Sequence, residues 1–227
     1  MNIVSVSENT VVILFDQIIN HENFLVITEL VNVIEKNMSD SVVDIIPSYA
    51  SVHVTFNLLK VSGLDFRRQL KMLIKNHNFS VNSSKSEKII EIPVYYGKEV
   101  ALDLSYIADR AKLSEDEVVE AHSSKVYDVY AIGFAPGFAY LGNVDERISS
   151  PRKETPRKKV LKGSLGIADQ QTAIYPSDSP GGWQIIGRTP VQLIDYNSEK
   201  LTQFSAGDKV KFTPISKSEY ASLGGDL

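Results

Sequence analysis

Apolar residues in the first 95 positions follow two spacings, one typical of strands and one typical of helices. Valines alternate with serines at residues 4–7, and residues 11–15 form an unbroken apolar run, so both stretches predict strands. Apolar residues recur every three or four positions at 24–34 and 66–74, which predicts two amphipathic helices. Further strands are expected at residues 42–46, 52–56 and 89–95. This order of elements indicates an α+β fold, with a small ferredoxin-like domain over residues 1–96.

A polar stretch at residues 82–87 interrupts this pattern, and we place the domain boundary after the next strand, near Tyr96-Gly97. Two short helices are expected between residues 101 and 123, where Ser114 and Glu117 form a capping box. The pair resembles a DNA-binding helix-turn-helix. Acidic side chains far outnumber basic ones in this segment, however, so phosphates would repel it and no nucleic-acid partner is expected.

Short β-rich segments separated by glycine and proline dominate the chain after Val126. Many short strands with turn signals between them are typical of a closed or nearly closed barrel. The candidate strands lie at residues 126–132, 166–168, 172–175, 184–186, 191–194 and 209–212. The sequence therefore predicts a β-barrel domain over residues 97–227.

Composition narrows the classes of function. The chain has 227 residues, 43% of them hydrophobic, which suffices for buried cores in two domains. The formal net charge of −4 gives no reason to expect a nucleic acid or an anionic membrane as a partner. Because cysteine is absent, disulfides and thiolate catalysis are excluded. No secretory signal or membrane-length apolar segment is visible, so we expect a cytoplasmic protein.

Between residues 131 and 190, glycine and proline are too dense for ordinary connecting loops. Glycine permits backbone turns that a side chain would block, and proline fixes φ, so the clusters indicate tightly shaped loops. Plain β-turns of an all-β domain are the alternative interpretation. The residues expected to shape the loops are Gly133, Pro136, Gly137, Gly181 and Gly182.

These loops contain no self-contained catalytic signature. Lys162-Gly163-Ser164 lacks the glycine spacing of a phosphate-binding loop. No two of the four histidines have helical metal-ligand spacing, so no metal site is expected. His53 alternates with two valines and is expected to face solvent on the opposite side of its strand.

Arginines offer the most specific recognition chemistry in the second domain. Arg152, Arg157 and Arg188 can each present a planar fork to a carboxylate or phosphate, which favours a small anionic substrate, and Arg157 and Arg188 are candidates for catalysis. Neighbouring lysines add positive charge, although a solvated basic loop is the alternative interpretation. For Trp183 the alternative to ligand contact is burial in the barrel core, and for Ser179 it is capping of the following turn. The candidate substrate-binding residues are Arg152, Tyr175, Ser179, Trp183 and Gln184.

His122 stands at the end of the second expected helix, just before the strand at residues 126–132. A histidine titrates near neutral pH and can act as a general acid or base. A histidine stabilised by the C-terminal end of the helix dipole is the alternative. The residue is therefore a third catalytic candidate beside the two arginines.

Several motifs occur in a fixed order along the chain, at residues 133–142, 151–157, 163–164, 174–176, 179–184 and 187–190. In this order they resemble the family of 5-oxoprolinase B subunits, formerly called allophanate hydrolase subunit 1, which includes the sporulation-kinase inhibitor of bacilli. The resemblance covers nearly the whole chain. Ala135, Ala139 and Leu161-Lys162 depart from the family pattern, which affects the expected loop shapes.

The resemblance implies a cyclophilin-like barrel and a subunit of an ATP-dependent 5-oxoprolinase, which opens 5-oxo-L-proline to L-glutamate. It also implies two partners, the C and A subunits of that 5-oxoprolinase, with ATP used through the assembled complex. The family's His-Ser/Thr pair falls on His122-Ser123, which favours a catalytic role for His122. Two alternatives stay open: an inhibitor of a sporulation-type sensor histidine kinase, docking through residues 180–183, and an allophanate hydrolase subunit.

Overall fold

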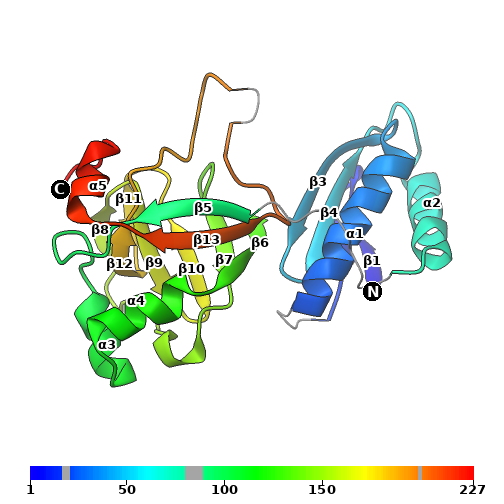
Figure 1. Cartoon of the computed structure of the whole chain (residues 1–227). Helices are drawn as coiled ribbons and strands as arrows, with labels where there is room; N and C mark the ends of the chain where they lie inside the picture. The colour runs from blue at the N-terminus through cyan, green and yellow to red at the C-terminus, as the bar shows by residue number, and fades with distance from the viewer. Residues whose placement is uncertain (17–20, 80–88, 199–200) are drawn as a thin grey trace. The chain divides into compact units, whose positions relative to one another are not determined.

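The computed structural model describes residues 1–16, 21–79, 89–198 and 201–227 (Figure 1). The chain forms two compact units, Met1–Ser86 and Glu87–Leu227. The polar stretch at residues 82–87 lies outside the described residues. Within the described part of the chain, no helix is long and apolar enough to cross a membrane.

The first unit is a four-stranded antiparallel sheet with two helices (Figure 1). Its strands lie in the order β1 (Asn2–Ser5), β2 (Thr10–Leu14), β4 (Ser51–Phe56) and β3 (Val42–Ser48). The helices are α1 (His21–Met38) and α2 (Gly63–Asn76). Alternation along β4 places Val52 and Val54 in the core and leaves His53 exposed between them, as predicted. The strands and helices expected in residues 1–76 are confirmed.

The ferredoxin-like arrangement expected for this unit is not confirmed. That arrangement needs a strand after the second helix to join the same sheet. Here β1 pairs with β2 at that edge. The strand that follows α2, β5 (Ile89–Val94), pairs in parallel with β13 (Lys209–Pro214) of the second unit. The division between the units consequently falls before β5, at Ser86/Glu87, and not after it near Tyr96-Gly97.

The second unit is built on a seven-stranded sheet in the order β12-β9-β10-β7-β6-β13-β5. Its remaining strands are β6 (Val126–Ile132), β7 (Ala139–Gly142), β9 (Ser164–Ala168), β10 (Gln171–Ile174) and β12 (Gln184–Arg188). The two outermost strands meet where Tyr95 and Arg188 exchange backbone hydrogen bonds of 2.9 and 2.8 Å. This junction nearly closes the sheet into a barrel, in agreement with the expected architecture.

Large apolar side chains from facing strands fill the barrel interior, and two helices pack against the same core. These helices are α3 (Leu104–Ala111) and α4 (Glu115–Ser123). The predicted capping box begins α4: Ser114 Oγ accepts from the Glu117 N–H at 3.2 Å, and the Glu117 carboxylate accepts from the Ser114 N–H at 2.7 Å. Both helices expected in this segment are confirmed.

Other parts of the second unit differ from the expected elements. The basic residues after Pro156 form a strand, β8 (Arg157–Val160), which pairs with β11 (Ser179–Gly181) in a two-stranded sheet. Residues 191–194 are not a regular strand and contribute an isolated bridge between Ile194 and Thr202. A 3₁₀ helix, η1 (Glu146–Ile148), and a short helix, α5 (Lys217–Ser222), were not predicted.

Candidate functional site

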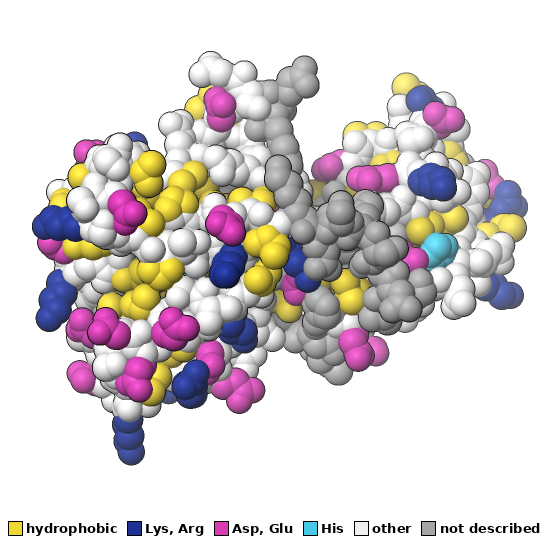
Figure 2. Space-filling model, in the orientation of Figure 1, with side chains coloured by type: hydrophobic (Ala, Val, Ile, Leu, Met, Phe, Trp, Pro, Cys, Tyr) yellow, Lys and Arg dark blue, Asp and Glu magenta, His cyan; other side chains and the backbone are white. Residues whose placement is uncertain are grey.

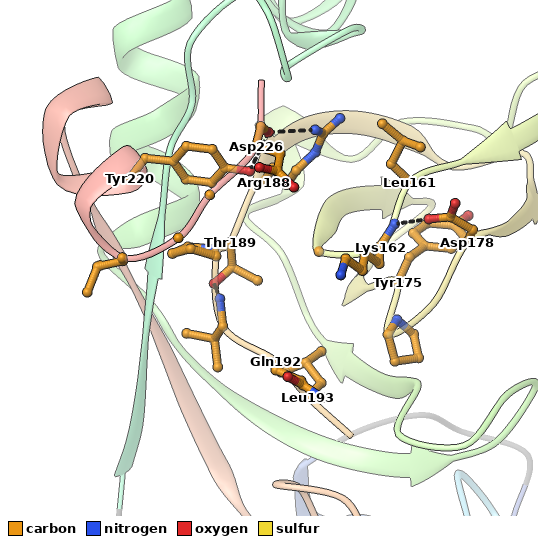
Figure 3. A pocket seen from close by; sticks show the side chains of 17 residues that line it. Leu161, Lys162, Tyr175, Asp178, Arg188, Thr189, Gln192, Leu193, Tyr220 and Asp226 are labelled. Carbon is orange, nitrogen blue, oxygen red and sulfur yellow. Dashed lines mark hydrogen bonds between the residues drawn. The ribbon is translucent and has the colours of Figure 1, made fainter. Parts of the chain in front are cut away.

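Arg188, the last residue of β12, lies between two pockets of the second unit. The larger pocket has a volume of about 570 Å³ and the smaller one about 280 Å³, and Arg188 lines both. Pairing of β12 with β9 and with Tyr95 fixes the backbone that carries this arginine. The charged and hydroxyl-bearing side chains of the larger pocket are Lys162, Tyr175, Asp178, Arg188, Thr189, Tyr220 and Asp226 (Figure 3).

Two donors converge on one oxygen atom in the larger pocket. The carbonyl oxygen of Asp226 accepts from Arg188 Nη1 at 3.2 Å and from Tyr220 Oη at 3.1 Å (Figure 3). Arg188 Nε is buried, and no described residue supplies it with a hydrogen-bond partner. Burial raises the pKa of Tyr220 whereas the neighbouring Arg188 lowers it, and the net result is a raised pKa that keeps the hydroxyl protonated as a donor.

An acidic side chain of this pocket is already paired within the protein. Asp178 accepts from Lys159 Nζ at 2.8 Å and from the backbone N–H of Lys162 at 2.8 Å. The Lys159 ammonium, followed by the Lys162 N–H, lowers the pKa of the Asp178 carboxyl. Acidic and basic side chains are interspersed over the face of the second unit seen in Figure 2. Arg188 shares the larger pocket with Lys162 and the smaller pocket with Arg157 and Lys159.

The smaller pocket brings together Arg157 and Arg188, the two arginines expected to be catalytic. Arg157 Nη2 donates to Asp103 Oδ1 at 2.7 Å, and Lys153 Nζ donates to the same oxygen at 3.2 Å. Asp103 Oδ2 accepts from the Ile185 N–H at 2.6 Å. The carboxylate that precedes α3 thus holds together the 151–157 segment and β12.

Sequence reasoning missed Asp103 and counted it only among the acidic residues near the helices. Its side chain is 7% exposed. Burial raises the pKa of the Asp103 carboxyl, but hydrogen bonds from Arg157, Ile185 and Lys153 outweigh burial and hold the pKa below its usual value. These partners lie 50, 54 and 82 residues away along the chain, so no local pattern indicates them.

Trp183 is buried, with an exposed fraction of 4%. It packs edge-on against Phe138 at a centroid distance of 5.7 Å, and Phe138 in turn packs edge-on against Tyr175. The guanidinium carbon of Arg152 lies over the Trp183 ring, 5.8 Å from its centroid. The position of Trp183 agrees with the core interpretation, and its side chain is not presented to a docking helix.

Three of the expected substrate-binding residues lie together, because Tyr175 and Trp183 belong to one buried cluster and Arg152 lies over the Trp183 ring. Tyr175 shares the larger pocket with Arg188. Gln184 is buried, where its Nε2 donates to the Pro151 carbonyl at 2.9 Å and its Oε1 has no hydrogen-bond partner among the described residues. Ser179 begins β11, opposite Val160. Arg152, Ser179, Trp183 and Gln184 line neither pocket.

His122 is fully buried inside the barrel. Its Nε2 lies 2.9 Å from Thr172 Oγ1, which itself donates to the Gly166 carbonyl at 3.0 Å, so Nε2 carries the proton. Nδ1 then accepts from Tyr96 Oη at 3.0 Å. Burial lowers the pKa of His122 to about 3. Since both nitrogens are engaged and the ring lines neither pocket, the geometry supports a neutral structural imidazole instead of the expected general acid or base.

The expected loop-shaping residues act in different ways. Gly137 has a φ of +75°, a left-handed conformation that favours glycine. A Cβ at Gly181 would lie 2.3 Å from a tyrosine hydroxyl, whereas at Gly182 the nearest atom would be 3.6 Å away. Gly133 has open space around it, and Pro136 is exposed. Geometry thus requires glycine at Gly137 and Gly181 but not at Gly133 or Gly182.

The described residues contain no group arranged to hold a metal ion, and the Lys162-Gly163-Ser164 turn is not arranged to receive a phosphate. No group of three or more His, Asp or Glu side chains in that part of the chain is placed to hold a metal ion. The backbone N–H groups of Lys162, Gly163 and Ser164 all donate within the protein. Their acceptors are Asp178 Oδ1 at 2.8 Å, the Tyr175 carbonyl at 2.7 Å and the Leu161 carbonyl at 3.1 Å.

Residues 1–204 match the family model described as carboxyltransferase domain, subdomain C and D. The B subunit of the 5-oxoprolinase of Bacillus subtilis (strain 168) is 35% identical to this chain, over 94% of this chain and 92% of the relative. The urea amidolyase of Saccharomyces cerevisiae is 24% identical over 87% of this chain and 12% of its own length. The crystal structure of TTHA0988 superposes with a TM-score of 0.80 at 28% identity, covering 92% of this chain. The chain spans 41% of TTHA0988.

Proposed function

Because the chain belongs to the family of 5-oxoprolinase B subunits, we propose that it is a non-autonomous subunit of an ATP-dependent 5-oxoprolinase. That reaction adds water across the lactam C–N bond of 5-oxo-L-proline: the carbonyl carbon gains the hydroxyl, the nitrogen gains a hydrogen, and L-glutamate results. The observation that carries the proposal is the 35% identity to a 5-oxoprolinase B subunit over 94% of this chain.

We assign ATP use to the complex assembled with the C and A subunits. The N–H groups of the Lys162-Gly163-Ser164 turn are all occupied within the protein, so this turn is not arranged to receive a phosphate. The segment related to this chain is also joined to further sequence in the longer TTHA0988, which agrees with action beside other domains. On this assignment the chain supplies substrate recognition and the partners supply the nucleotide site.

Within the chain, we assign substrate contact to Arg188. Attack on an amide carbonyl places negative charge on its oxygen, and a nearby fixed guanidinium such as that of Arg157 stabilises this charge. Arg157 borders the smaller pocket with Arg188 but is held by Asp103, so it adds positive charge from a fixed position. Asp103 is therefore a positioning residue in this proposal.

The test is to assemble the purified chain with its proposed partner subunits and to measure glutamate release from 5-oxo-L-proline and ATP. We expect no turnover by the chain alone and turnover by the complex. A complex that is stable but releases no glutamate would contradict the proposal. Robust ATP-dependent turnover by the isolated chain would contradict the proposal that the subunit needs partners for activity.

A further inference from the structure

The strongest unassigned feature of the second unit is the oxygen site between α5 and β12. Arg188 Nη1 and Tyr220 Oη approach the same oxygen from two elements that are far apart in sequence, at 3.2 and 3.1 Å. A guanidinium and a hydroxyl that point at one oxygen form an arrangement typical of carboxylate recognition. In the structure that oxygen is the backbone carbonyl of Asp226, and a carbonyl is a weaker acceptor than a carboxylate.

The site retains unused binding capacity. Arg188 Nε is buried and has no hydrogen-bond partner among the described residues. An unsatisfied buried donor costs free energy, and a ligand that replaces the resident segment and accepts from this donor recovers that cost. A carboxylate has two oxygens and can accept from Nε and Nη of one guanidinium together. The adjoining pocket of about 570 Å³ has room for a small molecule.

The chain segment that fills the site is held by local backbone geometry. Gly224 has a φ of +85°, which turns residues 224–226 back from α5 towards Arg188 (Figure 3). A Cβ at Gly225 would lie 2.3 Å from the Tyr220 ring, so glycine lets the backbone pass over that ring. The Asp226 side chain is exposed and brings a negative charge near Arg188. Departure of this segment would free both donors and remove that charge.

We propose that Arg188 and Tyr220 form a binding site for the carboxylate of a small ligand, and that the Asp226 carbonyl occupies this site in the ligand-free chain. The proposed function names one such ligand, 5-oxo-L-proline, and the inference rests on it for that identity. Asp178 opposes the ligand less than an unpaired carboxylate would, because it is paired with Lys159 and accepts from the Lys162 N–H.

Calorimetric titration of the full chain with 5-oxo-L-proline and with its neutral carboxamide tests whether the site recognises the carboxylate. We expect the acid to bind at least tenfold more tightly than the amide, because the amide loses a charged hydrogen bond. Equal binding of the two compounds, or no binding of the acid, would overturn the proposal. Tighter binding of inorganic phosphate than of the acid would overturn it in favour of a phosphate site.

Single substitutions test whether the acid binds at Arg188 and Tyr220. Arg188→Gln is expected to weaken binding of the acid at least tenfold and Tyr220→Phe about fivefold, whereas Arg110→Gln, an exposed arginine on α3 outside both pockets, should match the wild type. Gly224→Val strains the left-handed residue and should tighten binding about fivefold by weakening the resident segment. Binding unchanged in Tyr220→Phe and Gly224→Val, with both variants folded by circular dichroism, would overturn the site even if Arg188→Gln fails to fold.

The same variants separate this inference from the proposed function. If the isolated chain binds the acid through Arg188 but the complex releases no glutamate, the site stands and the oxoprolinase assignment fails. If the complex turns over and Tyr220→Phe leaves KM unchanged, the oxoprolinase assignment stands and the site fails. A raised KM with unchanged kcat in Tyr220→Phe supports both.

Discussion

His122 shows how one buried side chain sets a pH dependence at the scale of a residue. Burial lowers its pKa to about 3 in the folded chain, against about 6.5 for an ordinary histidine. Below about pH 6.5 this histidine is therefore protonated in the unfolded chain but stays neutral in the folded chain. The contribution of neutral His122 to the free energy of unfolding is fully present above that pH. It falls by about 1.4 kcal/mol per pH unit as the pH decreases towards 3.

We expect His122→Gln to remove this slope. Between pH 7 and pH 5 the wild type should lose about 2 kcal/mol of unfolding free energy that the variant does not lose. The variant should already be about 1 to 2 kcal/mol less stable at pH 7, because glutamine does not reproduce both hydrogen bonds to Thr172 and Tyr96. Urea unfolding at both pH values measures the difference, with exposed His53→Gln as the control. Equal slopes in wild type and His122→Gln would contradict this assignment.

Asp103 is the second residue whose neighbourhood yields a prediction. Asp103→Asn leaves the guanidinium of Arg157 without its carboxylate in a site where the Asp103 side chain is 7% exposed, and should cost about 3 kcal/mol of stability. Asp109→Asn, exposed on α3, is the matched control and should change stability by less than about 0.5 kcal/mol. Urea unfolding at pH 7 measures the loss of stability in both variants. A similarly small loss in Asp103→Asn and Asp109→Asn would show that the ion pair of Asp103 with Arg157 is not stabilising.

The two residues act in different pH ranges. The pKa of Asp103 is lowered in the folded chain, so its contribution is present above the ordinary carboxyl pKa of about 3.9 and is lost as the pH falls through the folded value. The histidine contribution begins to fall near pH 6.5. The slope measured between pH 7 and pH 5 therefore reports His122 and leaves the Asp103 contribution intact.

At the scale of elements, β11 and the turn after it contain a matched pair of glycines. A Cβ at Gly181 would lie 2.3 Å from the hydroxyl of Tyr175, a ring that is 1% exposed and packed against Phe138, so the ring has little room to move. At Gly182 the nearest atom would be 3.6 Å away. We expect Gly181→Ala to cost about 2 kcal/mol through overpacking, and Gly182→Ala to cost less than about 1 kcal/mol. Thermal unfolding of the two variants measures this difference in stability. Equal melting temperatures would contradict the prediction.

Elements with a strong local pattern were predictable from the sequence. The strand at residues 126–132 was located to the residue, and Ser114 with Glu117 marked the start of α4. The strand β8 was missed because its Arg-Lys-Lys-Val sequence has no apolar alternation and pairs only with the short β11. Residues 191–194 have a strand-like composition but no regular ladder, since a strand depends on a partner as well as on its own residues.

The candidate site was less predictable than the strands. Sequence chemistry selected Arg157 and Arg188, and the fold does bring them to one pocket. It did not reveal Tyr220, because α5 was not expected, or Asp103, whose partners are distant along the chain. It also placed His122 in a catalytic role, although the fold encloses that ring. Burial and long-range hydrogen bonds are properties of the folded core, so a motif alone does not determine them.

At the scale of the whole molecule, β5 decides where the second unit begins. Its residues pair with β13 over the full strand (Figure 1). Tyr95, directly after β5, bridges to Arg188. Ile92 and Val94 are 1% and 0% exposed within the barrel core. Burial of two such side chains contributes about 3 to 6 kcal/mol. The barrel therefore depends on a strand that precedes the boundary suggested by the sequence.

We consequently expect a fragment of residues 87–227 to fold and a fragment of residues 97–227 not to fold. The shorter fragment leaves one edge of β13 unpaired, exposes the core where Ile92 and Val94 lay, and removes the Tyr95 bridge that fixes Arg188. Because total stabilities of single domains are only about 5 to 15 kcal/mol, losses of this size are sufficient to abolish cooperative folding. Near-ultraviolet circular dichroism and urea titration of both fragments measure the outcome. If residues 97–227 unfold cooperatively at the same urea midpoint as residues 87–227, β5 is dispensable to the barrel and the unit begins after it.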